Sequence, residues 1–212
     1  MFIQKNIQKI KNIIQKWLTE MMFKKYLSSP QPGGIAIDCG ANIGDISLRL
    51  AKTGVHVYAF EPNPFAFEKL TEKLKGFNNV SCIRKGVWDR NTVTQLYSHD
   101  LAINDETFWS FGSSIIKDKG NIDKSRSVEV QIIDLTEFIE GLDRNIDLLK
   151  IDIEGAECEL LEKFIEKELY KKVAITLVET HDGKITGQKQ KTDKVRDLIR
   201  ERGIKNIKLL WL

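Results

Sequence analysis

The sequence is poor in cysteine, and the cysteines it has follow no disulfide or metal-binding pattern. Its 212 residues include three cysteines, an odd number, at Cys39, Cys82 and Cys158. Two of these lie in apolar, strand-like segments, and no pair has the spacing of zinc ligands. We therefore expect free thiols and a reducing compartment.

Long apolar runs and a strong charge imbalance are also absent. No apolar run is long enough to cross a bilayer, and the N-terminal region lacks the apolar core and cleavage site of a signal peptide. The 33 basic and 30 acidic residues give a formal charge of +3, too small to indicate a nucleic-acid partner. We expect a cytoplasmic protein with one globular domain, an appendage and no nucleic-acid partner.

The appendage is a predicted basic amphipathic helix at the N-terminus. Its apolar positions recur in steps of four and three, at Ile3, Ile7, Ile10, Ile14, Trp17 and Met21. Lysines dominate the remaining positions. Three roles fit such a helix: contact with an anionic membrane surface, pairing in a homodimer, or packing over its own domain. Residues 28–34 are rich in serine, proline and glycine, so we divide the chain into a helix and linker, 1–29, and a domain, 30–212.

Strand-like and helical stretches alternate along that domain. This order is typical of an α/β fold with a mostly parallel central sheet and helices on both faces. The expected strands are 35–38, 55–60, 80–87, 146–153, 173–178 and 207–212. Between the third and fourth, stretches 92–97 and 128–133 alternate in polarity and predict an extension of the sheet. The aromatics of this segment, Phe108, Trp109 and Phe111, either line a substrate pocket or belong to the core.

The first two predicted strands end in acids, and glycines follow the first. Asp38 precedes Gly40, Asn42 and Gly44, and the second strand delivers Glu61. The glycines allow a tight turn into a helix, and the second acid is placed to bind a ribose diol. A dinucleotide fingerprint needs three glycines around its pyrophosphate. An acid in a two-glycine turn instead suits an ammonium group, so the pattern predicts S-adenosylmethionine as the cofactor. Alternatively, the glycines only shape the turn and the second acid is a solvated strand end.

Further polar residues follow the later strands, at Asp152, Glu154, Glu179 and His181. Ligands of open α/β sheets bind beyond the carboxyl ends of the strands. Methyl transfer to a hydroxyl requires a base, and His181 has the best unperturbed pKa for it, with Asp152 orienting it or acting as the base itself. We assign catalysis to Asp152, Glu154 and His181. The same group could instead hold Mg²⁺ or Mn²⁺.

Two neighbouring residues have structural expectations. Lys150 is predicted to pair with an acid such as Asp152. Glu157 is predicted to support the helix that begins after Gly155, since acids are favourable in a first turn. His56 and His99 lack a placement at a strand end, so we give them no role.

Three motifs together resemble the FkbM family of S-adenosylmethionine-dependent methyltransferases. They are DCGANIG at 38–44, EPNP at 61–64 and KIDIEGAE at 150–157, and the resemblance covers about 35–181. It implies a Rossmann-like class I methyltransferase fold and O-methylation of a hydroxyl on a sugar, glycan precursor or secondary metabolite. The cofactor residues that it implies are Asp38, Gly40, Asn42, Gly44 and Glu61, to which we add Asn63 of the second motif. Past His181 the chain shows one clear strand where such sheets usually end in an antiparallel pair.

Two other functions fit parts of this pattern. One is a nucleoside-binding module without catalysis, whose acidic strand ends have no chemical role. The other is a nicotinamide-dependent oxidoreductase on a similar sheet, although the missing third glycine and Asp38 count against it. The methyl acceptor is a small molecule or a saccharide, and nothing in the motifs specifies it further.

Overall fold

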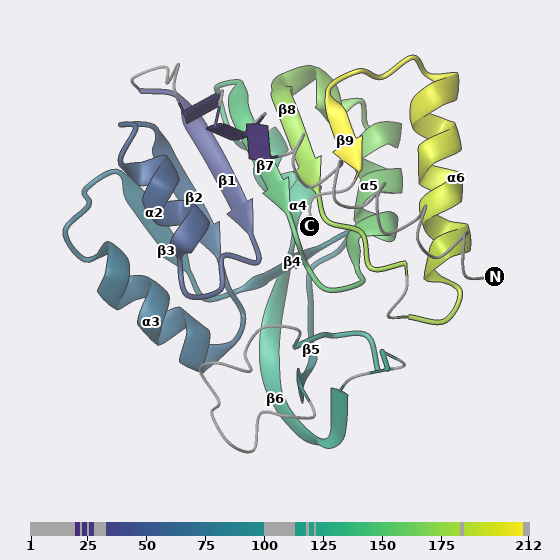
Figure 1. The fold of residues 1–212 in the computed structure, drawn as a ribbon, viewed down its shortest axis with the longest axis horizontal. Coiled ribbons are helices and arrows are strands. Elements are labelled where there is room, and N and C mark those ends of the chain that lie inside the picture. The colour runs from purple at the N-terminus through teal and green to yellow at the C-terminus, as the bar shows by residue number, and fades with distance from the viewer. Residues whose placement is uncertain are drawn as a thin grey trace.

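A six-stranded parallel sheet forms the centre of the molecule (Figure 1). The computed structural model describes residues 20–21, 23–24, 26–27, 33–99, 113–117, 119–120, 122–182 and 185–209. The strand order is β3-β2-β1-β7-β8-β9, and each neighbouring pair in this described sheet is parallel. The strands are β1 (Ile35–Cys39), β2 (His56–Phe60), β3 (Val80–Ile83), β7 (Ile146–Ile151), β8 (Val173–Val178) and β9 (Ile207–Leu209). The predicted parallel sheet is confirmed, and its last strand is parallel too.

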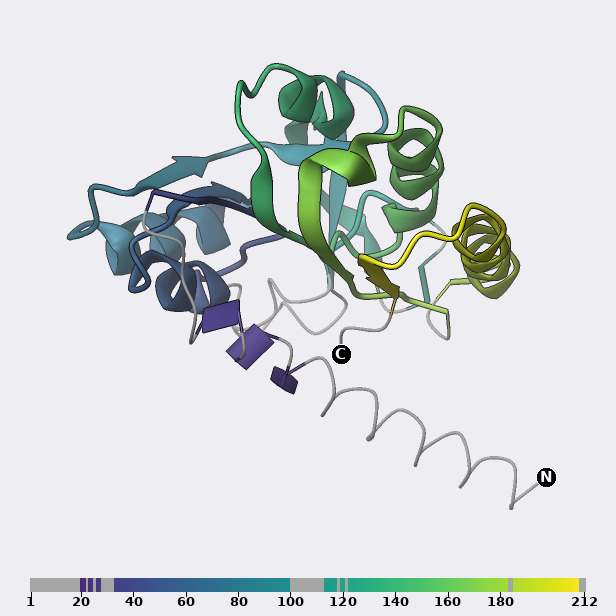
Figure 2. The same cartoon turned by 90° about the horizontal axis from the view of Figure 1, so that it is seen from above.

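Helices cover both faces of this sheet, as Figure 2 shows from above. On one face, α2 (Asp45–Ala51) and α3 (Pro64–Leu74) contribute to a buried apolar cluster with β1 and β2. On the other face, α4 (Leu135–Glu140), α5 (Glu157–Glu166) and α6 (Gln188–Glu201) pack against the sheet, and a short 3-10 helix, η2 (Leu169–Lys172), leads into β8. This arrangement leaves the carboxyl ends of the strands available for a ligand site.

A second, smaller sheet lies below the first in Figure 1. It contains β4 (Gly86–Trp88), β5 (Thr92–His99) and β6 (Ile122–Asp134) in the order β4-β6-β5. The predicted added strands are therefore confirmed, within a sheet of their own. The predicted single strand 80–87 is wrong, because the chain makes a tight turn in which the Lys85 N–H donates to the Ile83 carbonyl. Gly86 then opens the second sheet, where a side chain would overlap Ile132.

The described end of the N-terminal segment packs against its own domain. Phe23 is fully buried, and the Arg49 guanidinium of α2 lies 4.5 Å from its ring centroid. The same guanidinium pairs with Glu20 at 2.9 Å. The apolar stripe Ile3–Trp17 and the aromatics Phe108, Trp109 and Phe111 lie outside the described residues. Among the described residues, no helix has both the length and the apolar character needed to span a bilayer.

Candidate active site

A cavity opens where the strand ends of the large sheet meet the small sheet. Its walls come from the turn and helix start after β1 (40–43 and 45–46), from Glu61 and Pro62 after β2, and from Lys150 and 152–154 at the end of β7. The small sheet contributes an apolar wall that includes Val87, Leu96 and Ile132. The cavity therefore has a polar side at the strand ends and an apolar side at the second sheet.

The predicted site residues divide into two groups around this cavity. Gly40, Asn42, Glu61, Asp152 and Glu154 line it. The other four do not: they are Asp38, Gly44, Asn63 and His181. Each member of the second group contacts a residue beside the cavity or shapes an element that forms its wall.

Glu61 is the best-placed candidate for a ribose. Its side chain is buried, and its two oxygens accept the backbone N–H groups of Asn42 and Asn63, each at 2.8 Å. Burial raises the pKa of Glu61 to about 7, against the opposing effect of these two hydrogen bonds. Each carboxylate oxygen retains a second lone pair, so the residue can still accept hydrogen bonds from a diol.

The two glycines of the first motif are required by close packing. Gly40 has φ +76°, and a Cβ there would overlap the carbonyl oxygen of Asp152 in the loop after β7. Gly44 has φ +88°, and its Cβ would lie 2.8 Å from Leu70 Cδ1 on α3. Both positions also lie in the left-handed region that favours glycine. The tight turn predicted from the sequence is confirmed, and packing against neighbouring elements is its physical reason.

Asn63 has a clear structural role beside Glu61. It is the N-cap of α3, where its side-chain oxygen accepts the N–H groups of Phe65 and Ala66. Pro64 occupies the first position of the helix, as is common for proline. The backbone N–H of Asn63 donates to Glu61, which connects the start of the helix to the residue predicted to bind the ribose.

Asp38 lies below the cavity in a buried charge pair. It is fully buried, with one oxygen 3.2 Å from Lys150 Nζ and the other accepting the Ser47 hydroxyl at 2.7 Å. The lysine also donates to the Gly40 carbonyl at 2.7 Å and lies 3.5 Å from Asp152. Burial lowers the pKa of Lys150, but the two aspartates outweigh it and raise the pKa. The predicted pairing of Lys150 with Asp152 is confirmed, and Asp38 is a nearer partner that the sequence did not reveal.

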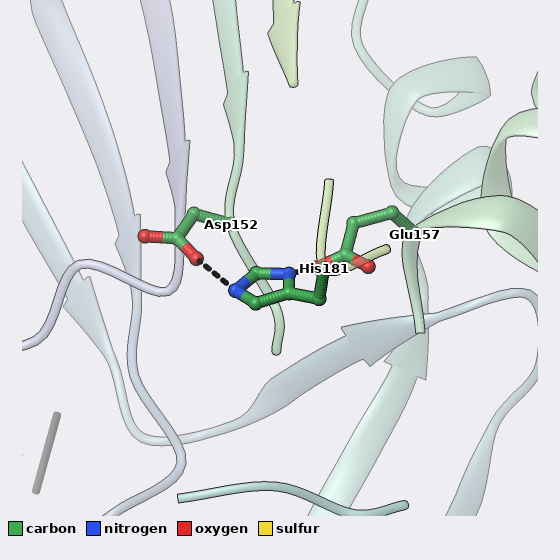
Figure 3. A group of neighbouring side chains, drawn as sticks. All are labelled: Asp152, Glu157 and His181. Carbon is green, nitrogen blue, oxygen red and sulfur yellow. Dashed lines mark ion pairs between the residues drawn. The ribbon is translucent and has the colours of Figure 1, made fainter. Parts of the chain in front are cut away.

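His181 lies in a ring of carboxylates beside the cavity, part of which Figure 3 shows. Its Nδ1 is 3.0 Å from Glu157 and its Nε2 is 3.0 Å from Glu154, while Asp152 and Glu179 lie 3.8 and 3.7 Å from Nε2. Burial lowers the pKa of His181, but its contacts with the two nearest glutamates raise the pKa to about 10. The imidazole is thus a cation at neutral pH. With a proton on each nitrogen it has no lone pair for general-base catalysis.

Glu157 holds the loop that carries the predicted catalytic acids. Its oxygens accept the N–H of Ile153 at 3.1 Å and the N–H of Gly155 at 3.0 and 3.1 Å. It therefore supports the start of α5, as expected, and in addition it binds His181. This second contact could not be predicted from local patterns, because 24 positions separate the two residues along the chain.

Comparisons with known proteins agree with the motifs. The family model of the methyltransferase FkbM domain matches residues 38–205. The hexuronic acid methyltransferase AglP of Haloferax volcanii is 26% identical over 159 residues, covering 74% of this chain and 60% of the relative. The methyltransferase sdnD of Sordaria araneosa is 27% identical over 170 residues, covering 68% of this chain and 65% of the relative. The chain thus spans less than two thirds of either relative.

Solved structures show a more distant likeness. One is that of a proposed methyltransferase from Streptococcus mutans in complex with SAH (S-adenosylhomocysteine), with 14% identity and a TM-score of 0.48, covering 86% of this chain and 81% of that one. A likeness this remote adds nothing to the assignment. The family match, by contrast, includes all three strand-end motifs and most of the chain. The chain therefore belongs to the FkbM methyltransferase family.

Proposed function

We propose that this protein transfers a methyl group from S-adenosylmethionine to a hydroxyl group of a saccharide or related small molecule. The observation that carries the proposal is that Glu61 and Asp152 line the same cavity. Glu61 is the candidate cofactor ligand and Asp152 is the candidate base. The family match supports the chemistry. The relative from Haloferax volcanii, named for hexuronic acid, favours a sugar acceptor.

The residues of the cavity fit the cofactor. Glu61 has lone pairs left for ribose hydroxyls, and the backbone at Gly40 and Asn42 lines the same wall. Asp38 acts on the cofactor site indirectly in this proposal, because it holds Lys150 against the Gly40 carbonyl. When bound, S-adenosylmethionine supplies an electrophilic methyl group on a positively charged sulfur.

We propose Asp152 as the group that takes the proton of the acceptor hydroxyl. It lines the cavity, and its Oδ1 has no hydrogen-bond partner among the described residues. Burial, reinforced by Glu154, raises the pKa of Asp152 against the opposing charges of Lys150 and His181. A raised pKa makes a carboxylate a stronger base near neutral pH. His181 then supplies a fixed positive charge among the acids.

Glu154 is a weaker candidate for the base although it also lines the cavity. One of its oxygens is 2.6 Å from Lys119 Nζ and 3.0 Å from His181 Nε2. Burial raises the pKa of Glu154, but these two cations outweigh it and hold the pKa well below the usual range. We therefore assign Glu154 to the alignment of His181.

A divalent cation is the second way to activate the hydroxyl. Asp152, Glu157 and His181 each offer a ligand atom within 4.8 Å of the others. Both nitrogens of His181 already contact glutamate oxygens, so a cation would have to break one of these contacts. We propose metal-independent transfer, which EDTA leaves unchanged. Activity lost with EDTA and restored by Mn²⁺ or Mg²⁺ would favour the metal instead.

The test is transfer of a radiolabelled methyl group to a panel of uronic acids and neutral sugars. Asp152→Asn should bind SAH as the wild type does and lose about 100-fold or more in kcat, since a positioned base contributes that much. SAH binding without transfer to any acceptor would favour the non-catalytic binding module. Binding of NAD in place of SAH would favour the oxidoreductase.

The N-terminal segment and the location of the protein belong to the same proposal. We propose that the N-terminal segment contacts the domain 30–212 through Phe23, and that the free thiols of a cytoplasmic protein remain reduced. Deleting residues 1–27 should then lower thermal stability. Loss of dimerisation or of binding to anionic vesicles on deletion would support the other two roles of the helix.

A further inference from the structure

A short strap crosses the loop that carries the candidate acids. The strap consists of residues 113–117 and 119–120, between the two long strands of the small sheet. At one end Ser114 exchanges two backbone hydrogen bonds with Tyr97 on β5, at 2.9 and 3.1 Å. At the other end the backbone of Lys119 forms an isolated antiparallel β-bridge with Ile185, just before α6. The strap thus joins the small sheet to the far side of the large one.

Ser114 fixes the backbone of the loop under the strap. Its side chain is almost fully buried, and its hydroxyl donates to the Glu154 carbonyl at 2.6 Å while accepting the Ile116 N–H at 3.0 Å. Glu154 has φ +54°, a left-handed conformation that a non-glycine residue rarely adopts. Such a conformation persists only where the surroundings enforce it, and the serine hydroxyl is part of that enforcement.

Lys119 fixes the side chain of the same residue. The lysine side chain has no exposed surface, and its Nζ lies 2.6 Å from Glu154 Oε2. That oxygen is also 3.0 Å from His181 Nε2. One carboxylate oxygen therefore lies between two buried cations, and a substitution of Lys119 removes one of them. Burying the charge of a lysine costs free energy. Here the buried ammonium contacts a residue that lines the cavity.

We propose that Lys119 is a positioning residue for methyl transfer. Through Glu154 it holds the His181 imidazolium in line with Asp152 at the cavity wall. This inference rests on the proposed function, in which Asp152 is the base, but the geometry that it describes can be tested without turnover. No motif marks the residue, because the pairing joins positions 35 apart in the sequence.

The experiment compares Lys119→Met with Lys119→Arg and with the control Lys117→Met. The control removes an exposed lysine from the same strap. The readouts are SAH affinity, the separate values of kcat and KM, and the ring signals of His181 in ¹H–¹⁵N spectra. The chain has three histidines, so a His181→Gln variant assigns those signals.

In Lys119→Met we expect SAH affinity and KM for the donor to stay within about twofold of wild type. The His181 signal should be displaced, and kcat should fall by about 100-fold, a loss typical of a 1 Å misplacement. Lys119→Arg should recover part of the signal and the rate, and the control should change neither. A wild-type His181 signal and kcat in Lys119→Met would overturn the inference.

A second variant keeps the test decisive if Lys119→Met does not fold. Ser114→Ala leaves the lysine in place and removes the hydrogen bonds of the hydroxyl to the Glu154 carbonyl and the Ile116 N–H. It should displace the His181 signal in the same direction by a smaller amount. An unmoved signal in a folded Ser114→Ala protein would also contradict the strap's role. If the wild type does not bind SAH, the proposed function fails, while the His181 spectra still decide whether the strap positions the imidazolium.

Discussion

Replacing Lys150 with methionine tests the buried charge pair beneath the cavity. Methionine keeps much of the lysine stem and removes its charge. The Lys150 ammonium contacts Asp38 at 3.2 Å and the Gly40 carbonyl at 2.7 Å. Without it, the fully buried Asp38 carboxylate keeps only the Ser47 hydroxyl as its hydrogen-bond partner among the described residues. An uncompensated charge would then remain in the core.

The expected cost follows from that burial. Removing one member of a buried ion pair costs about 3–5 kcal/mol, a large share of the roughly 5–15 kcal/mol that stabilises a typical protein. With a urea slope of about 2 kcal/mol per M, a loss of 4 kcal/mol lowers the unfolding midpoint by about 2 M. Urea titration followed by tryptophan fluorescence measures this shift.

A double variant identifies the cause of that loss. Asp38→Asn removes the stranded charge, so Lys150→Met combined with Asp38→Asn should be more stable than Lys150→Met alone. The two substitutions are thus expected to be non-additive. A loss under about 1 kcal/mol in Lys150→Met, or a double variant whose loss equals the sum of the two single losses, would contradict a stabilising role of this charge pair.

Other predictions concern the turn after β1, the ribose ligand and the base. Gly40→Ala should lose about 3 kcal/mol or more in urea unfolding because its Cβ overlaps the Asp152 carbonyl, whereas Gly54→Ala, with φ +85° but open space around it, should lose about 1 kcal/mol. Equal losses would contradict this. Only ionised Glu61 presents full acceptor capacity to a diol, and its pKa is about 7, so SAH affinity measured by calorimetry should rise about tenfold from pH 6 to pH 8. In Glu61→Gln the SAH affinity should be lower and should not change with pH. A wild-type SAH affinity that does not change with pH would contradict the assignment of Glu61. Asp152→Asn should keep SAH affinity within about twofold and lose about 100-fold or more in kcat, and unchanged kcat would exclude this base.

The pH dependence of stability at Glu61 has the opposite sign to that of binding. The pKa of Glu61 in the folded protein, about 7, lies above its usual value of 4.5. The folded state therefore holds the proton more tightly than the unfolded state, and this contribution to stability is full below pH 4.5 and lost as the pH rises through 7. Relative to Glu61→Gln, the wild type should become less stable between pH 5 and pH 8 in urea titrations.

Much of the fold could be predicted from local patterns. The sheet strands and the helices at Asn63–Pro64 and after Gly155 have periodicity or caps that the sequence displays directly. The break after Ile83 could not be predicted, since it depends on the fit of Gly86 against Ile132, a residue of another strand. Apolar or β-branched residues stand on both sides of Arg84 and Lys85, and this local pattern fits one continuous strand as well as two strands of different sheets.

The candidate site also has features that the sequence predicts and features that it does not. Strand topology was enough to predict that Asp152 and Glu61 would meet at one cavity. The role of His181 was not predictable, because its charge depends on two glutamates that contact it from the loop after β7 and the start of α5. Pair contacts between distant positions, such as Lys150 with Asp38, leave no mark on the pattern of either segment.

The identity of the cofactor decides the proposed function, and calorimetric titration of SAH and of NAD into the wild-type protein measures it. We predict micromolar binding of SAH, no binding of NAD, and loss of at least tenfold in SAH affinity in Glu61→Ala, about 1.4 kcal/mol. Failure of the folded wild type to bind SAH, or binding that Glu61→Ala leaves unchanged, would contradict the cofactor site described above.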